Sequence, residues 1–195
     1  MLFISPDDYV PVKRDPRPAP DQTTAPSAET PIYPLVFIGP MASGKSKIGR
    51  RVARALRVPF IDTDSVVVAE HGAITDIFAQ HGEEHFRRLE RRAVSDALRN
   101  RAVVSLGGGA VLDADTQADL RRATVVSLTT TAAAVRNRSK NAKRPLLAAG
   151  PDAWQRIYDE RRPIYEALAS IHFDSSTRPV DAIAADIVKW VKKQS

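Results

Sequence analysis

The stretch Leu35-Val-Phe-Ile-Gly39-Pro-Met-Ala-Ser-Gly44-Lys45-Ser46 joins a short apolar run to a glycine-rich loop. The apolar run has the length of a buried strand, and the residues after the loop have the periodicity of an amphipathic helix. The loop matches the pattern Gly-x-x-x-x-Gly-Lys-Ser, in which the glycines let backbone N–H groups approach a polyphosphate. A strand, this loop and a helix in that order predict a nucleotide-binding P-loop.

Two side chains of the loop have predicted roles of their own. Lys45 is expected to reach the outer phosphates of ATP, and the Ser46 hydroxyl to take a place on Mg²⁺. An ordinary strand-to-helix turn is the alternative, but a chance match at every fixed position in the right context is rare. The predicted nucleotide-binding residues are Gly39, Ala42, Ser43, Gly44, Lys45, Ser46 and Lys47.

GTPases, motor ATPases and small-molecule kinases all have P-loops, and the rest of the sequence separates these classes. A GTPase would need an Asn-Lys-x-Asp motif to read guanine and an Asp-x-x-Gly switch, and neither occurs in the chain of 195 residues. A motor with its sensors needs a larger domain. The sequence therefore favours a small-molecule kinase.

Apolar or β-branched runs alternate with helical patterns from residue 35 onward, which predicts a three-layer α/β sandwich with a five-stranded parallel sheet. The runs lack polar alternation, so we expect strands that are buried on both faces. The predicted strands are Leu35–Gly39, Pro59–Asp62, Ala102–Leu106, Thr124–Leu128 and Ile171–Asp174. The predicted helices are Lys45–Leu56, Ile74–Gln80, Glu83–Arg99, Ala114–Arg122, Ala132–Arg138, Ala153–Ala169 and Val180–Lys192. Ligands should gather at the carboxyl ends of the strands.

The first 33 residues differ in composition from the rest. Eight of the fourteen prolines lie between Pro6 and Pro34, so we expect residues 1–33 to be a disordered tail and residues 34–195 to form the kinase domain. Five acidic and three basic residues lie in this tail, which leaves a net charge of +8 on the remainder. The arginines fall singly among carboxylates, which favours anionic small substrates over nucleic acid. Cysteine is absent, and no run is long enough for a membrane span.

The predicted third strand ends in glycines and offers no acid for Mg²⁺, so we expect the second strand to supply one. Asp62 and Asp64 follow that strand, and they would project to the same side if the extended conformation continued. Asp62 would then face Ser46 and the metal, while Asp64 would orient the acceptor hydroxyl and take its proton. The alternative makes Asp64 only the N-cap of a following helix.

Three consecutive glycines, Gly107-Gly108-Gly109, can bring backbone N–H groups close to an acceptor, although a flexible loop is the alternative. Arg87 and Arg161 have the guanidinium groups that grip a carboxylate with two parallel hydrogen bonds. For Arg87, a surface ion pair with Glu83 one helical turn earlier is the simpler reading of the pattern alone.

In combination these motifs strongly resemble those of the shikimate kinase family. The motifs are Asp62-Thr63-Asp64, Phe86-Arg87-Arg88-Leu89-Glu90, Gly107-Gly108-Gly109, Arg144-Pro145-Leu146-Leu147 and Arg161, all behind the P-loop. The resemblance implies the strand order 2-3-1-4-5 and transfer of the γ-phosphoryl group of ATP to the 3-hydroxyl of shikimate, in the chorismate pathway. It also implies that Ser46 and Asp62 hold Mg²⁺, and that Asp64, Arg87, Gly108, Gly109 and Arg161 bind shikimate.

The resemblance further implies a mobile lid over about Ser139–Gly150, with Arg144 closing on ATP and the transferring phosphate. Lys45, Asp64 and Arg144 are thus the expected catalytic residues. Apolar positions matching the ring pocket are Ile74, Phe78, Phe86, Pro145 and Leu146. The chain departs from the usual pattern at Ala42, where a glycine is common, and at Lys47, where a hydroxyl residue is usual. Arg136 and Arg138 are both candidates for the arginine that covers adenine.

Two other functions remain open at this point. One is a related kinase with a gluconate-type acceptor, although the glycine triplet and both arginines count against it. The other is a catalytically inactive kinase-like binding module, although Lys45, Asp62 and Asp64 are all present. For the leading interpretation we expect a monomer in the cytoplasm that binds shikimate and ATP, and neither nucleic acid nor a membrane.

Overall fold

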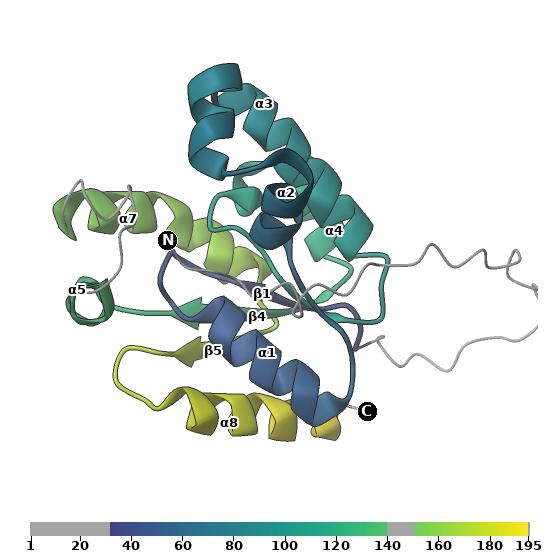
Figure 1. Ribbon diagram of the computed structural model, residues 1–195. Coiled ribbons are helices and arrows are strands. Elements are labelled where there is room, and N and C mark those ends of the chain that lie inside the picture. The colour runs from purple at the N-terminus through teal and green to yellow at the C-terminus, as the bar shows by residue number, and fades with distance from the viewer. Residues whose placement is uncertain (1–31, 140–150, 195) are drawn as a thin grey trace, which may run out of the picture.

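Strand β1 (Leu35–Ile38) lies at the centre of a five-stranded sheet and leads through the P-loop into helix α1 (Lys45–Leu56), as Figure 1 shows. The computed structural model describes residues 32–139 and 151–194. The other strands are β2 (Phe60–Asp62), β3 (Val103–Ser105), β4 (Thr124–Thr129) and β5 (Ile171–Asp174). The other helices are α2 (Thr63–His71), α3 (Ile74–Ala97), the 3₁₀ turn η2 (Ala110–Leu112), α4 (Ala114–Leu120), α5 (Ala132–Ser139), α7 (Pro151–Leu168) and α8 (Val180–Lys193).

The strands pair in the order β2-β3-β1-β4-β5, and every pair is parallel. Val36 in β1, for example, lies between Val104 of β3 and Val125 of β4. The predicted fold class and strand order are therefore confirmed. Because all strands run in one direction, the P-loop, the end of β2 and the glycine triplet after β3 meet at the same edge of the sheet.

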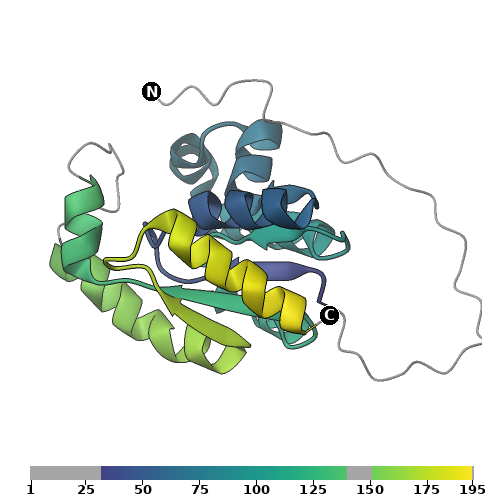
Figure 2. The same cartoon turned by 90° about the horizontal axis from the view of Figure 1, so that it is seen from below.

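The helices form a layer on each face of the sheet, as the two views in Figures 1 and 2 show. Leu35 and Phe37 of β1 pack in a core with α1 and α8, whereas Val36 and Ile38 pack in a second core with α3, α4 and α7. All four side chains are essentially inaccessible to solvent, as the unbroken apolar run predicts. Burial on both faces holds for β1, β3 and β4.

The two edge strands, β2 and β5, do not follow that expectation, and in β2 both Phe60 and Asp62 are only half-buried. Ile171 and Phe173 are half-buried, while His172 and Asp174 are exposed. The physical reason is that β5 is an edge strand, paired only with β4, so one of its faces is left partly open.

Helices α2 and α3 form a smaller unit at the top of Figure 1. A third apolar cluster, made by Val67 of α2 and by Ile77, Phe86 and Ala93 of α3, holds them together. Helix α3 breaks at Gly82, where φ is 77°. This break matches the gap between the predicted helices that end at Gln80 and begin at Glu83.

Helix α2 was not among the predicted helices, and its start corrects the expectation for the two acids. Asp62 is the N-cap of α2, and its carboxylate accepts a hydrogen bond from the backbone N–H of Ser65 at 3.2 Å. The extended conformation therefore stops at Asp62 and does not continue to Asp64. Asp64 lies in the first turn of α2, so it is not the N-cap either.

Residues 1–31, 140–150 and 195 lie outside the described residues. They include most of the predicted tail, Arg144, Pro145, Leu146 and nearly all of the predicted lid. Ile32 and Tyr33, the last residues assigned to the tail, pack against the core between the sheet and α1 and α8. Among the helices that the structure describes, none combines the length and the apolar character that a membrane span requires.

Candidate active site

The P-loop turns sharply between β1 and α1, and three of its residues have positive φ angles. The angles are 133° at Gly39, 64° at Ala42 and 91° at Gly44. A Cβ atom at Gly39 would collide with the carbonyl oxygen of Leu128 in β4, so only glycine fits where the loop leaves the sheet. Ala42 adopts the left-handed conformation, which costs a residue with a Cβ atom about 1 kcal/mol. Glycine would have no such cost at this position.

Lys45 begins α1 and is largely buried. Its Nζ atom donates hydrogen bonds to the carbonyl oxygens of Gly39 and Pro40, each at 2.9 Å, so the ammonium group lies over the loop. The N-cap residue Gly44 supplies no side-chain cap, and the first turn of α1 carries no acidic residue. The positive end of the helix dipole is therefore not neutralised there, which suits a bound phosphate.

Ser46 and Asp62 meet beside the P-loop. The Ser46 hydroxyl donates a 2.6 Å hydrogen bond to Oδ2 of Asp62, and Oδ1 of Asp62 caps α2. Both side chains are half-buried. A hydroxyl and a carboxylate oxygen are hard ligands of the kind that Mg²⁺ prefers, usually with waters and substrate phosphates completing its shell. In residues 32–139 and 151–194 no cluster of three or more His, Cys, Asp or Glu side chains offers another metal site.

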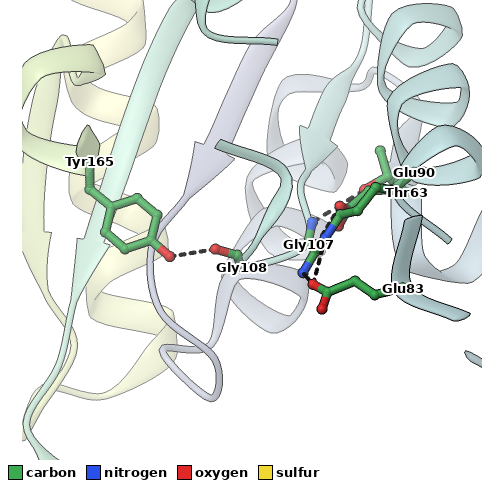
Figure 3. Close-up of polar contacts among 7 residues, drawn as sticks. Thr63, Glu83, Glu90, Gly107, Gly108 and Tyr165 are labelled. Atoms are coloured by element: carbon green, nitrogen blue, oxygen red, sulfur yellow. Dashed lines mark hydrogen bonds and ion pairs between the residues drawn. The ribbon is translucent and has the colours of Figure 1, made fainter. Parts of the chain in front are cut away.

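Thr63, which the sequence analysis treated only as a spacer between two acids, ties β2 to the glycine triplet. Its side chain is fully buried, and its hydroxyl donates to the Ser105 carbonyl at 3.4 Å. The same hydroxyl accepts a hydrogen bond from the Gly107 N–H at 3.3 Å, a contact drawn in Figure 3. Thr63 thereby fixes where the chain leaves β3. Nothing local in the sequence marks this role, because the contact spans more than forty residues.

Each glycine of the triplet faces a different neighbour. A Cβ atom on Gly107 would lie 2.5 Å from an Asp64 carboxylate oxygen and 2.6 Å from a Glu90 oxygen. On Gly108 it would lie 3.5 Å from the backbone nitrogen of Met41 in the P-loop. On Gly109 it would lie 3.0 Å from the Cζ atom of the Arg87 guanidinium. The missing side chains thus let two carboxylates, the P-loop and a guanidinium approach one short segment of backbone.

Arg87 makes the predicted surface pair and also a second, more buried pair. Nε and Nη2 donate to Oε1 of Glu83 at 3.2 and 2.8 Å, while Nη1 donates to Oε2 of Glu90 at 2.7 Å. Glu83 is exposed and Glu90 is buried, and both appear in Figure 3. Three of the five guanidinium N–H groups are used in this way, which leaves two for a ligand. The neighbouring Arg88 forms an ion pair with exposed Glu84, also contacts His85 and is itself 62% exposed.

Glu90 is a site residue that the sequence analysis did not single out. One oxygen of its carboxylate accepts a hydrogen bond from Arg87, and the other lies against the backbone of Gly107. Burial raises the pKa of Glu90, while the hydrogen bond and the charge of Arg87 and the charge of Arg161 oppose that rise. Arg161 itself is half-buried on α7. A signal was present in the sequence, because Glu90 occupies the apolar face of α3 with Phe86, Ala93 and Val94.

Arg138 approaches the P-loop from the other side. Its guanidinium donates to the carbonyl oxygen of Ala42 at 3.3 Å and to the carbonyl oxygens of Ser175 and Ser176 after β5. Both arginines considered for the adenine side are exposed, and Arg138 is in contact with the loop through Ala42. Lys47 is also exposed.

A phosphate-binding loop next to a cluster of arginine and carboxylate side chains, on a parallel sheet of order 2-3-1-4-5, defines a P-loop kinase of small molecules. Comparison with known proteins narrows this class. A family model described as "Shikimate kinase" matches residues 41–192. The shikimate kinase of Streptomyces coelicolor is 44% identical over 140 residues, which covers 70% of this chain and 82% of that protein.

Two further comparisons agree. The shikimate kinase of Mycobacterium tuberculosis is 42% identical over 166 residues, covering 82% of this chain and 94% of that protein. The structure of shikimate kinase from Acinetobacter baumannii in complex with shikimate superposes with a TM-score of 0.77 at 28% identity, covering 83% of this chain and 93% of that one. The chain belongs to the shikimate kinase family, and it is an ATP-dependent kinase that acts on a hydroxyl group.

Proposed function

We propose that this chain carries out the reaction of its family, the transfer of the γ-phosphoryl group of ATP to the 3-hydroxyl of shikimate, which gives shikimate 3-phosphate and ADP. Family membership supports the reaction. The structural observation that carries the acceptor assignment is the Arg87 guanidinium, which pairs with buried Glu90 and lies against Gly109 of the glycine triplet, while Gly108 lies next to the P-loop. The half-buried Arg161 is the proposed second guanidinium. Two guanidinium groups at one place suit an acceptor with a carboxylate better than a neutral alcohol.

On the nucleotide side, the P-loop backbone and the start of α1 would hold the phosphates of ATP. The residues proposed for this contact are Gly39, Ala42, Ser43, Gly44, Lys45, Ser46 and Lys47. Lys45 now donates to two loop carbonyls, and a bound phosphate would replace these acceptors with a stronger one. Its ammonium group would then stabilise the negative charge on the transferring phosphoryl group.

The residues beside the P-loop fit Mg²⁺, because the Ser46 hydroxyl and the Asp62 carboxylate already lie in hydrogen-bond contact. Mg²⁺ bound there would neutralise phosphate charge as it does in other P-loop enzymes. Asp62 is fixed by its capping bond to Ser65, so its free lone pairs keep one orientation toward Ser46. We propose Ser46 and Asp62 as the two protein ligands.

On the acceptor side, the shikimate carboxylate would take the unused N–H groups of Arg87 together with Arg161. Asp64 lies against Gly107 and would accept the proton of the attacking hydroxyl, while that oxygen forms a bond to the γ-phosphorus. The bond from the γ-phosphorus to its bridging oxygen breaks, and ADP leaves. Backbone N–H groups of Gly108 and Gly109 would donate to the acceptor. Arg144 stays a predicted catalytic residue, since it lies outside the described residues.

An ADP-release assay with a panel of acceptors tests this function. Shikimate should support turnover with Mg²⁺ and ATP, whereas gluconate, nucleoside monophosphates and a blank without acceptor should give only background. If turnover were faster with gluconate than with shikimate, the gluconate-type acceptor would be the correct assignment. No turnover with any acceptor, together with intact nucleotide binding, would instead favour the inactive binding module.

The metal assignment has its own test. Asp62→Asn keeps the size and the ability of the side chain to accept a hydrogen bond from Ser65, but removes the charge. Turnover should fall and should require a higher Mg²⁺ concentration, with little change in the unfolding temperature. Unchanged activity and an unchanged Mg²⁺ requirement would show that Asp62 is not the metal ligand.

The expectations for the tail, the monomeric state and the cytoplasmic location remain predictions. Deletion of residues 1–30 should preserve both folding and shikimate phosphorylation, because Ile32 and Tyr33, which pack on the core, are retained. A stable truncation with greatly reduced activity would show that the tail takes part in catalysis.

A further inference from the structure

Helix α7 contacts both the P-loop and the glycine triplet through one face. Trp154, Tyr158, Arg161 and Tyr165 are spaced four, three and four residues apart, which places them along a single stripe of an α-helix. Trp154 Nε1 donates to the carbonyl oxygen of Met41 in the P-loop at 3.1 Å. Eleven residues later, the Tyr165 hydroxyl donates to the carbonyl oxygen of Gly108 at 2.6 Å, as Figure 3 shows.

Tyr165 is fixed at its position by burial. Its side chain is 3% exposed and belongs to the core between the sheet and α7. Burial raises the pKa of its hydroxyl to about 12, against the opposing charge and hydrogen bond of Arg161. The hydroxyl therefore keeps its proton near neutral pH, where it donates to Gly108.

The orientation of the Gly108–Gly109 peptide decides what this loop offers to an acceptor. A trans peptide is planar, with its C=O and N–H pointing in opposite directions. Because Tyr165 holds the Gly108 carbonyl, the Gly109 N–H must point away from Tyr165. Among the described residues, no loop or turn carbonyl accepts a backbone hydrogen bond from this N–H. It also belongs to the glycine against which the Arg87 guanidinium packs.

A peptide between two glycines can rotate with little steric resistance. If it turned over, it would present a carbonyl oxygen where it now presents an N–H, and an anionic acceptor would be repelled instead of bound. The hydrogen bond from Tyr165 opposes that rotation, because the carbonyl would otherwise lose its buried partner.

We propose that Tyr165 is a positioning residue, whose hydroxyl locks the Gly108–Gly109 peptide with the Gly109 N–H available to the acceptor substrate. This inference rests on the proposed function, because it assigns to Tyr165 a share in binding an anionic acceptor at that site. Tyr165 itself touches neither reacting group. The hydroxyl should matter for shikimate affinity, and hardly at all for ATP.

Tyr165→Phe removes only the hydroxyl and keeps the buried ring. The dissociation constant for shikimate, measured by calorimetry, should rise about tenfold, and KM for shikimate should rise with it. The affinity for a non-hydrolysable ATP analogue should stay within twofold of wild type, and kcat should change less than KM. Tyr158→Phe is the matched control, since it makes the same change two turns away on the same helix face and should leave shikimate affinity unchanged.

A second variant separates positioning from general destabilisation. Gly108→Ala in the Tyr165→Phe background restricts the loop again, because Gly108 has no positive φ and its Cβ atom would meet nothing nearer than 3.5 Å. This double variant should recover part of the lost shikimate affinity. Thermal unfolding and the ATP analogue report in parallel whether each variant is folded.

Three results would overturn the inference: wild-type shikimate affinity in Tyr165→Phe, an equal loss for shikimate and the ATP analogue, or no recovery in the double variant. The wild-type titration in the same series distinguishes a failure of the proposed function from a failure of the role of Tyr165. If wild type itself bound no shikimate, the proposed function would fail. If wild type bound shikimate and Tyr165→Phe bound it equally well, only the role of Tyr165 would fail.

Discussion

The P-loop and the proposed acceptor site lie side by side, but they are built in different ways. The P-loop is one contiguous segment in which backbone N–H groups and the start of α1 make the binding surface. The acceptor site takes side chains from α2, α3 and α7 and the backbone that follows β3. Its charges are already partly compensated, since Arg87 pairs with Glu83 and Glu90.

This difference predicts which substitutions each region tolerates. In the P-loop, we expect most side chains to vary as long as the backbone keeps its turns, because among its residues Lys45 and Ser46 are the ones proposed to act through their side chains. In the acceptor site, one altered side chain disturbs a network of neighbours. The two regions touch where Gly108 faces the backbone of Met41 and Gly39. The variants below therefore test whether a substitution in one region changes ligand binding in the other.

The largest effect is expected at Lys45. Lys45→Met removes the charge that faces the transferring phosphoryl group, and the loss of such electrostatic stabilisation typically lowers kcat by about 100- to 1,000-fold. Shikimate affinity, measured by calorimetry without nucleotide, should stay within about twofold of wild type. A parallel loss of shikimate affinity would contradict the separation of the two regions.

A somewhat smaller effect is expected at Gly107, in the opposite region. In Gly107→Ala the new Cβ atom would lie within 2.6 Å of oxygens of both Asp64 and Glu90, so both carboxylates must move. A displacement of about 1 Å at a reacting centre can cost about 100-fold in rate. Shikimate turnover should fall by that order, while binding of an ATP analogue is retained.

Gly108→Ala is the comparison for this variant, because its Cβ atom would meet nothing nearer than 3.5 Å. It should lose much less activity than Gly107→Ala. If the two variants lost equal activity, the cause would be general loop stiffness and not the two displaced carboxylates.

The contrast between the regions also explains how much the sequence could predict. The P-loop and the five strands are contiguous patterns, and their bounds came within about two residues of the structure. Helix α2 was missed because Val66, Val67 and Val68 are β-branched and favour a strand locally. The Asp62 cap with Ser65 was the signal that could have revealed this helix.

The acceptor site could be predicted only residue by residue. Arg87, Asp64 and the glycine triplet were recognised separately, but the contacts that join them are long-range. Thr63 to Gly107 and Tyr165 to Gly108 are such contacts, and no local pattern encodes them. Glu90 was overlooked because a carboxylate within an arginine-rich helical segment has the usual appearance of a surface ion pair.

A pH-dependent prediction concerns Glu90, which faces Arg87, Arg161, Asp64 and Asp113. Burial raises its pKa above the ordinary value of 4.5. The folded state therefore holds this proton more tightly than the unfolded state does, and the resulting stability is complete below pH 4.5 and lost as pH rises through the raised pKa. The unfolding temperature of wild type, relative to Glu90→Gln, should fall over that interval. A constant difference across the interval would refute the raised pKa.

The smallest effect is expected at Ala42, whose φ of 64° is unfavourable for alanine. Ala42→Gly should relieve about 1 kcal/mol of strain, offset in part by the greater flexibility of glycine in the unfolded chain. The free energy of unfolding should rise by a few tenths of a kcal/mol or stay level, and shikimate affinity should not change. A clear drop in stability would show that the left-handed turn is not strained.

The central claim is that Arg87 and Arg161 hold the carboxylate of the acceptor. Arg87→Ala and Arg161→Ala, each titrated with shikimate and separately with an ATP analogue, test it most directly, with Arg88→Ala as the control from the exposed surface pair. Charge-assisted hydrogen bonds of about 1.5–3 kcal/mol predict at least a tenfold loss of shikimate affinity in both variants. Arg88→Ala should bind shikimate as wild type does, and all three should bind the ATP analogue normally. Unchanged shikimate affinity in both Arg87→Ala and Arg161→Ala would contradict the account.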